Sequence, residues 1–187
     1  MTDFGGVNVD GSARFGISKV LLTRDQIATR VAELGAEITR DYAGRQPLLI
    51  GVLKGAFVFM ADLARAIDLP LDLDFMAVSS YGTATKTSGV VRIVKDLDAD
   101  LTDRHVILVE DIVDSGLTLS YLQRGLMARG PASLEICALF LKEGQQRAPV
   151  RVPYVGFQIP AEFIVGYGLD AAELYRNLPD VCVIEET

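Results

Sequence analysis

The chain has 187 residues, half of them apolar, and a formal net charge of −7, a size and apolar content that predict one compact domain over residues 1–187. The negative charge opposes sequence-independent binding to nucleic acid, because such binding uses Lys and Arg side chains to displace counterions from phosphates. The longest apolar runs fall far short of the ~18 residues that a membrane-spanning helix needs, and residues 1–10 lack the basic and then apolar pattern of a secretory signal, so we expect a cytoplasmic protein with no membrane partner.

The first predicted element is an amphipathic helix that begins after Thr23. Thr23 and Gln26 have the spacing of a capping box, and apolar residues then recur at helical spacing up to Gly44. Residues 48–52 form a short, continuous apolar run, which fits a strand buried on both faces of a parallel sheet. Residues 56–67 are then expected to form a second helix.

The middle of the chain continues this alternation. A helix is predicted to end at Gly130, and the polar residues 81–89 predict a mobile loop. The remaining elements are strands over residues 71–80, 90–94, 106–109 and 134–141, with the helix over residues 118–129. Alternating strands and helices indicate an α/β fold, a parallel twisted sheet flanked by helices. The tail from residue 155 has short apolar runs broken by glycine and proline, and we expect it to form a small C-terminal hood of short strands.

The segment 106–118 carries the strongest chemical pattern. An apolar strand runs into two acids, Glu110 and Asp111, and then into a turn that opens a helix, made of Ser115, Gly116, Leu117 and Thr118. In parallel α/β sheets, ligands bind beyond the carboxyl ends of the strands, where helix N-termini present free N–H groups. The glycine allows close backbone approach and the two hydroxyls can donate, so the turn is predicted to cradle a phosphate. It lacks the lysine and the spacing of a Walker A loop, which argues against a nucleoside triphosphate hydrolase.

Glu110 and Asp111 stand directly before this cradle, where two carboxylates would repel a phosphate. Two arrangements satisfy the electrostatics: the acids accept hydrogen bonds from sugar hydroxyls, or Mg²⁺ lies between the acids and the phosphate. A phosphorylated ribose fits both. The alternative is an ordinary polar strand end, since Asp and Ser are common at turns and helix caps.

Taken together, residues 106–118 resemble the signature of the type I phosphoribosyltransferases: an apolar strand, two acids, two aliphatic residues, Asp114, a Thr or Ser, a Gly, any residue and a Thr. The resemblance implies the fold predicted above, with the 5′-phosphate of phosphoribosyl pyrophosphate in the cradle and its ribose hydroxyls on the acid pair. Leu117 departs from some relatives, which place a longer polar residue there, and it can offer only its backbone N–H.

Three more stretches are similar to the hypoxanthine-guanine branch of this family, namely residues 53–55, 80–82 and 163–170, so that the resemblance covers about residues 15–187. It implies that Lys54 and Gly55 bind pyrophosphate in a loop with a non-proline cis peptide. It also implies that Ser80 and Tyr81 belong to a lid that closes over the reacting centre.

The same resemblance assigns the purine side of the site. It implies that Phe163 stacks on the base, that Ile164 offers backbone groups to the base edge, and that Arg176 reaches the pyrophosphate. Asp170 would help to hold a second Mg²⁺, which makes Glu110, Asp111 and Asp170 the expected metal-binding acids. The alternatives are a core position for Phe163, a solvated helix position for Arg176 and an ordinary surface position for Lys54.

Two charged side chains remain for the chemistry on the base. Asp114 is the nearest unassigned carboxylate to the cradle and is predicted to be the general acid/base for the proton at N7 of the purine. Lys142 ends the strand-like run 134–141 and therefore projects from the same sheet edge as the acid pair. Its ammonium group only donates hydrogen bonds, which favours the C6 carbonyl oxygen of hypoxanthine or guanine over the amino group of adenine. The alternative is an ordinary lysine after a strand.

We therefore predict a purine-salvage transferase that joins hypoxanthine or guanine to phosphoribosyl pyrophosphate with Mg²⁺, without an order of preference among hypoxanthine, guanine and xanthine. The resemblance further implies a homodimer or homotetramer. Two alternatives remain open. One is a xanthine-preferring or other nucleobase transferase on the same fold. The other is a regulator that senses phosphoribosyl pyrophosphate and binds RNA or DNA, which the negative charge opposes.

Overall fold

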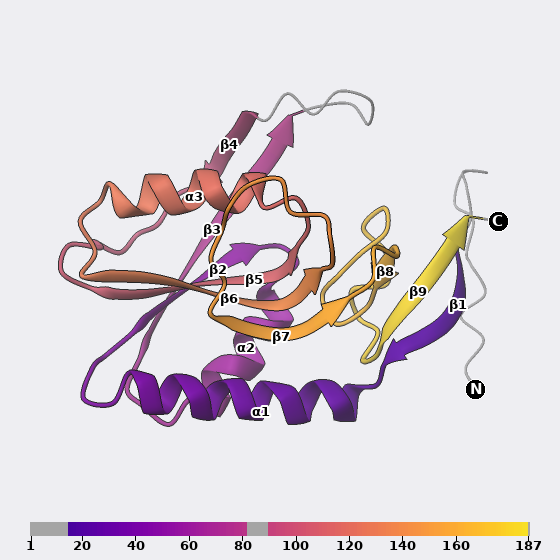
Figure 1. Cartoon of the computed structure of the whole chain (residues 1–187), viewed down its shortest axis with the longest axis horizontal. Coiled ribbons are helices and arrows are strands. Elements are labelled where there is room, and N and C mark those ends of the chain that lie inside the picture. The colour runs from indigo at the N-terminus through magenta and orange to yellow at the C-terminus, as the bar shows by residue number, and fades with distance from the viewer. Residues whose placement is uncertain (1–14, 82–89, 187) are drawn as a thin grey trace.

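The computed structural model describes residues 15–81 and 90–186 and has a central sheet of six strands in the order β4-β3-β2-β5-β6-β7. Five of these strands are parallel, and β4 runs antiparallel to β3 at one edge (Figure 1). The strands are β2 (Leu48–Leu53), β3 (Asp72–Tyr81), β4 (Val90–Lys95), β5 (His105–Val113), β6 (Ser133–Lys142) and β7 (Tyr154–Ile159). The predicted α/β sheet is confirmed, with one antiparallel edge strand.

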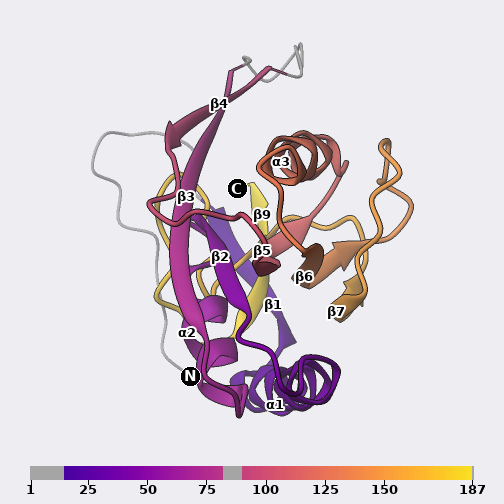
Figure 2. The same ribbon diagram turned by 90° about the vertical axis from the view of Figure 1, so that its left-hand side faces the viewer.

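Helices cover both faces of this sheet. α1 (Arg24–Asp41) and α2 (Phe57–Ala66) lie on one face and α3 (Leu117–Met127) lies on the other (Figure 2). The helix α1 begins as predicted, because Thr23 accepts a hydrogen bond from the Gln26 N–H and the Gln26 side chain accepts one from the Thr23 N–H. Each face has its own apolar core, one centred on α1 and α2 and one beneath α3. The sheet is therefore a rigid platform whose strand ends can hold a site.

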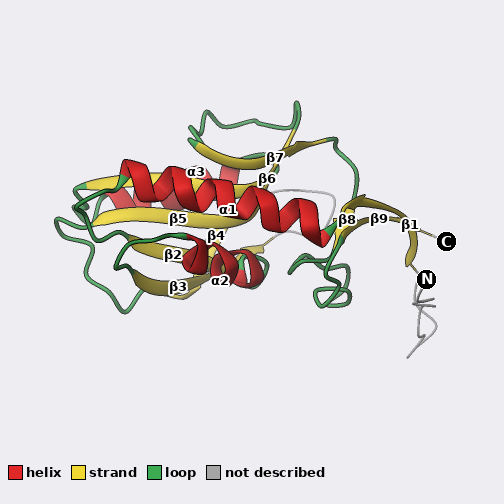
Figure 3. Cartoon of the chain, turned by 90° about the horizontal axis from the view of Figure 1, so that it is seen from below, coloured by secondary structure: helices red, strands yellow, loops and turns green. Residues whose placement is uncertain are grey.

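A second, smaller sheet forms the hood, and it differs from the prediction. Its strand order is β1-β9-β8, with β1 (Phe15–Leu22), β9 (Val181–Glu186) and β8 (Ile164–Val165) (Figure 3). The hood is therefore not purely C-terminal, because the N-terminal strand β1 pairs with β9. The strand β7, which was expected in the hood, instead extends the main sheet beside β6. Its Tyr154 hydroxyl donates to Asp41 at the end of α1, which helps to hold it there.

Two further sequence expectations need comment. β5 is longer than predicted, because pairing with β6 continues past the acids to Val113, so that Glu110 and Asp111 lie within the strand. The predicted loop 81–89 falls, from residue 82 onward, outside the described residues. No helix in the described part of the chain has both the length and the apolarity to cross a membrane.

Candidate active site

The predicted phosphate cradle is a cavity between the carboxyl end of β5 and the start of α3. Gly116 caps α3 in the left-handed region, with φ of 74°, a conformation that glycine adopts without steric cost. Gly116 has no side chain to cap the helix, and the Leu117 N–H makes only a long hydrogen bond of 3.4 Å to Ser115 Oγ, so the first N–H groups of α3 are available at the turn. The cavity measures about 130 Å³, and the polar residues that line it are Glu110, Asp114, Ser115 and Thr118. This arrangement suits a small anion at the N-terminus of α3.

The two acids point to different parts of the site. Successive side chains of a strand alternate between its faces, and of the pair only Glu110 lines the cradle. Asp111 instead lies against Gly55, in the loop after β2, where a Cβ atom would overlap its carboxylate. Of the two acids, only Glu110 therefore faces the cradle directly. The acid pair joins the cradle to the loop after β2.

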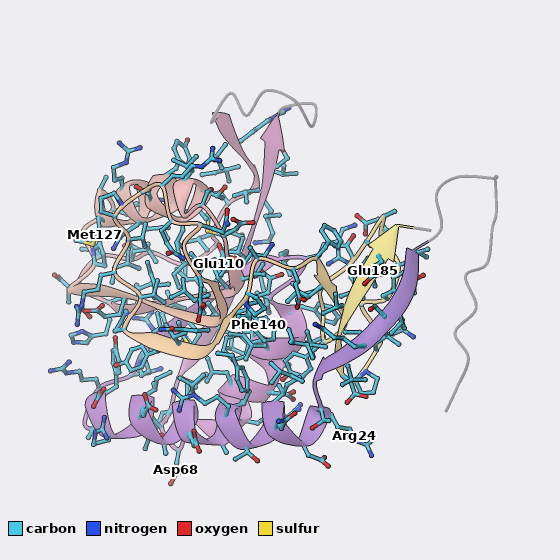
Figure 4. All side chains as sticks on the ribbon, turned by 45° about the vertical axis from the view of Figure 1, so that its right-hand side comes forward. Arg24, Asp68, Glu110, Met127, Phe140 and Glu185 are labelled. Atoms are coloured by element: carbon cyan, nitrogen blue, oxygen red, sulfur yellow. The ribbon has the colours of Figure 1, made fainter. Side chains whose placement is uncertain are left out.

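Glu110 is buried and Asp111 is half-buried, and this disfavours the anionic forms of both carboxyl groups. Glu110 is 9% exposed and lies toward the middle of the molecule in Figure 4, whereas Met127 and Glu185 lie toward its two ends. Burial and the neighbouring Asp111 carboxylate raise the pKa of Glu110 well above its usual range. Burial also raises the pKa of Asp111 to about 6, against the N–H of Ile112 and the charge of Arg176. A bound cation or a set of hydroxyl donors would stabilise the anionic forms and so lower both pKa values.

The loop after β2 has the predicted form. The Leu53–Lys54 peptide is cis, and Gly55 leaves space for Asp111 on one side. On another side the Gly55 carbonyl lies against Gly168 of the hood, so closely that a Cβ on Gly168 would overlap it. The loop is thus enclosed between β5 and the hood, which brings Lys54 to the same edge as the acid pair.

The hood supplies a second cation to this edge, and it is already paired. Arg176 Nη2 lies 2.6 Å from Asp170 Oδ1, and Arg176 Nη1 donates to the Gly168 carbonyl at 2.8 Å. Lys54 forms its own ion pair with Glu173 at 2.9 Å. Within residues 15–81 and 90–186, no three His, Cys, Asp or Glu side chains converge as a metal site, so Glu110, Asp111 and Asp170 do not form one three-acid cluster.

Lys142 and Asp114 meet on the other side of the cradle. Lys142 ends β6, its side chain is only 14% exposed, and its Nζ lies 3.3 Å from Asp114 Oδ2. This burial and pairing oppose the alternative of an ordinary surface lysine. The register of β6 and β7 places Ile159 beside Lys142, and the chain reaches Phe163 four residues later.

Phe163 and Ile164 have contrasting environments. Phe163 is 56% exposed, which opposes the alternative of a core position, whereas Ile164 is buried in β8 and pairs with Val183. Ser80 and Tyr81 end β3, beside the antiparallel strand β4, and the structure does not describe their side chains. Ser80 and Tyr81 therefore lie at the end of β3, outside the cradle, the loop after β2 and the hood.

Comparison with known proteins decides the family. The family model of the phosphoribosyl transferase domain matches residues 19–172. The chain belongs to the phosphoribosyltransferase family. Among its relatives is a hypoxanthine-guanine phosphoribosyltransferase of Mycobacterium tuberculosis, 56% identical over 168 residues, which cover 87% of this chain and 83% of the relative. A hypoxanthine-guanine phosphoribosyltransferase of Bacillus subtilis is 50% identical over 169 residues, or 90% of this chain and 94% of the relative.

Solved phosphoribosyltransferase structures agree over almost the whole chain. A crystal structure of a hypoxanthine-guanine phosphoribosyltransferase from Bacillus anthracis has a TM-score of 0.87 and 43% identity, and the match covers 92% of this chain and 99% of that one. A hypoxanthine phosphoribosyltransferase from Staphylococcus aureus also has a TM-score of 0.87, with 44% identity and coverage of 90% and 92%. The type I phosphoribosyltransferase fold that was expected from the signature is confirmed.

Sequence reasoning did not single out Glu173, which pairs with Lys54 beside the loop after β2. Its partner Lys54 is 119 positions away, so no local spacing announces the ion pair. Four non-glycine residues of the same hood segment have positive φ, namely Tyr167, Ala172, Glu173 and Tyr175. Such residues are uncommon and cluster at functional sites. None of the four is an Asn, the non-glycine residue type that most readily adopts this conformation, so the sequence did not indicate it.

Proposed function

We propose that this phosphoribosyltransferase transfers the phosphoribosyl group of phosphoribosyl pyrophosphate to hypoxanthine or guanine, which gives IMP or GMP and pyrophosphate. The observation that carries the proposal is the ion pair between Lys142 and Asp114 at the rim of the anion cradle. It combines a hydrogen-bond donor for a 6-oxo group with an acceptor for a purine proton. The names of the relatives at 50–56% identity point to the same activity.

Phosphoribosyl pyrophosphate fits the site in one orientation. The 5′-phosphate takes the cradle at the start of α3, with hydrogen bonds from Ser115, Thr118 and the backbone of Gly116 and Leu117. The ribose hydroxyls then lie toward the acid pair. The pyrophosphate group extends toward Lys54 and Gly55, with Arg176 on the hood side. This placement puts Lys54 and Arg176 at the leaving group and the carboxyl groups of Glu110 and Asp111 at the sugar.

The buried acids also fit Mg²⁺. Their anionic forms are disfavoured by burial, and carboxylate oxygens are the ligands that Mg²⁺ prefers, one or two at a time together with substrate oxygens. Glu110 and Asp111 would hold the ion together with oxygens of the substrate, and Asp170 would contribute to a second ion. When bound, Mg²⁺ supplies positive charge at the pyrophosphate. Both the protein and the substrate are therefore expected to supply ligands to the two ions.

The residues of the chain then divide the work of transfer. Cleavage of the bond between C1 and pyrophosphate builds positive charge on the ribose and negative charge on the leaving group. Lys54 and Arg176 stabilise the leaving group, while Asp114 accepts the proton from N7 of the purine. Lys142 donates to the C6 carbonyl oxygen and Phe163 stacks on the ring, with the Ile164 backbone at the base edge. Ser80 and Tyr81 would exclude water as part of a lid.

Turnover with a panel of bases tests the proposal. Hypoxanthine, guanine, xanthine, adenine, uracil and orotate are each incubated with phosphoribosyl pyrophosphate and Mg²⁺, and pyrophosphate release is measured. We expect release with hypoxanthine and guanine and none with adenine. Faster release with xanthine or a pyrimidine would instead identify another nucleobase transferase. Filter binding of RNA and DNA at low salt separates the enzyme from a nucleic-acid-binding regulator, and sedimentation velocity tests the expected homodimer or homotetramer.

A further inference from the structure

One carboxylate oxygen in the hood lies between the two cations at the leaving-group side of the site. Glu173 Oε2 is 2.9 Å from Lys54 Nζ and 3.5 Å from Arg176 Nη2. Lys54 follows β2 in the main sheet, whereas Arg176 belongs to the hood, so the contact joins the two parts of the fold. Lys54 and Arg176 lower the pKa of Glu173, with the hydrogen bond from Lys54 as the largest cause. Glu173 is therefore an anion at neutral pH.

The backbone conformation at Glu173 directs its carboxylate toward the two cations. Glu173 has φ of 66°, in the left-handed region that non-glycine residues rarely adopt. Its N–H donates to Asp170 Oδ2 at 2.8 Å, and Asp170 also pairs with Arg176. The same acid thus fixes both the turn and the guanidinium group that Glu173 approaches. Such conformations persist only where the surroundings hold them.

The ion pair between Glu173 and Lys54 opens more easily than the pair between Asp170 and Arg176. Lys54 and Glu173 are 66% and 65% exposed in their side chains, whereas Arg176 and Asp170 are 21% and 27% exposed. Exposed ion pairs contribute little, because water and salt screen them and two long side chains must be ordered. Glu173 is therefore the anion that can leave, while Asp170 stays with Arg176.

We propose that Glu173 is an internal counter-anion of the pyrophosphate subsite, which neutralises Lys54 and Arg176 in the free enzyme and sets the affinity for pyrophosphate by competing with it. The inference rests on the proposed function, in which these two cations bind the pyrophosphate group. An incoming pyrophosphate must displace the Glu173 carboxylate. Removal of its charge therefore strengthens binding, which is the opposite of the effect expected for a residue that contacts the ligand favourably.

Isothermal titration of the full-length protein with pyrophosphate, and separately with phosphoribosyl pyrophosphate, both with Mg²⁺ present, tests this. Glu173→Gln should bind both roughly 2- to 5-fold more tightly than wild type, the range expected for the loss of one exposed ion pair. The difference should shrink as salt is added. Glu33→Gln is the matched control, because Glu33 on α1 also forms a 2.8 Å exposed ion pair, with Arg30, and it should bind as wild type does.

The possible results of these titrations distinguish failure of the Glu173 inference from failure of the proposed function. Weaker or unchanged binding by a Glu173→Gln protein with a wild-type melting curve would overturn the inference alone, provided that wild type binds pyrophosphate and turns over hypoxanthine. If wild type binds neither ligand and no base is turned over, the proposed function falls and the inference falls with it. Glu173→Asp keeps the charge with a shorter reach, and its affinities should lie between those of wild type and Glu173→Gln.

Discussion

The Lys142 ammonium nitrogen lies 3.3 Å from Asp114 Oδ2, which pairs the end of β6 with the turn after β5. The lysine side chain is largely buried, whereas the aspartate side chain is 56% exposed. The aspartate is therefore the open side of the pair, which solvent or a ligand can reach. The open side faces the cradle rim, where Asp114 is also a lining residue. Recognition of the base and proton transfer from it are therefore expected to depend on one another.

Replacement of Asp114 tests the proton transfer. Asp114→Asn keeps the shape of the side chain but cannot accept the N7 proton, and we expect kcat to fall by ~10²–10⁴, the usual contribution of general acid/base catalysis. Steady-state kinetics with saturating hypoxanthine and phosphoribosyl pyrophosphate measure this. An unchanged kcat would show that Asp114 is not the general base.

Replacement of Lys142 tests base selection. A hydrogen bond from a charged donor contributes ~1.5–3 kcal/mol, so Lys142→Ala should lower kcat/KM for hypoxanthine and guanine by roughly 10- to 150-fold. Affinity for phosphoribosyl pyrophosphate, measured by titration, should barely change. Lys19→Ala, which removes a lysine paired with Glu162 in the hood, is the control. Full activity on both oxopurines together with continued rejection of adenine would contradict the assignment.

The acid pair is predicted to act in binding. Glu110→Gln and Asp111→Asn each replace a carboxyl group by an amide, and both should weaken the binding of phosphoribosyl pyrophosphate and Mg²⁺ more than they lower kcat. Calorimetric titrations of each variant with the two ligands give the affinities. Native affinity for both ligands would mean that neither acid lies at the ribose or the metal.

Gly55 is expected to accept no side chain. A Cβ at this position would overlap the Asp111 carboxylate, so Gly55→Ala should lower the free energy of unfolding by ~1–3 kcal/mol, as overpacking does. It should also weaken the binding of phosphoribosyl pyrophosphate. Gly125→Ala is the matched control, because Gly125 lies within α3 and has open space at its Cβ. There alanine should raise the free energy of unfolding by up to ~1 kcal/mol. Urea unfolding of the two variants measures the contrast.

Asp74 gives the fold a dependence on acid that is separate from catalysis. Burial would raise its pKa, but hydrogen bonds from the N–H groups of Ala99, Phe75 and Asp98, with the charge of Lys95, lower it below 3.8. A lowered pKa in the folded state stabilises the fold above the unfolded pKa, and this stabilisation is lost as the pH falls through the folded value. Asp74→Asn should therefore lower the free energy of unfolding by ~1–3 kcal/mol at pH 7.

The pH series of that variant carries the test. Urea unfolding at steps from pH 7 to pH 3 should show the gap between wild type and Asp74→Asn closing only below pH 3.8. A gap that stays constant throughout would mean that the charge of Asp74 contributes nothing, and that only its shape does.

The sequence predicted what local chemistry determines. The capping box at Thr23, the buried runs of β2 and β5, and the small-residue turn at Gly116 all involve neighbours in the chain, and the structure has each of them. The anion cradle could be predicted because the strand, turn and helix that form it are contiguous in the sequence.

Features that depend on distant partners were missed or misplaced. β1 has mostly exposed residues and two irregularities in its pairing, so its strand pattern is weak without β9. The edge position of β7 depends on β6, and the split of Glu110 from Asp111 depends on how far pairing with β6 extends. Glu173 meets Lys54 only after the hood has closed on the loop at Gly55.

The hood also imposes an order on how the chain can fold. β1 has its partner in β9, whose pairing joins Phe15 to Glu186 (Figure 1), whereas β2, β5 and β6 find theirs within the body of the chain. Contacts between residues so far apart form late, because closing a long loop precedes any gain from the contact. On the ribosome the central sheet and its cradle can assemble while the hood still lacks its last strand. The cradle at the start of α3 can thus form before β9 completes the hood.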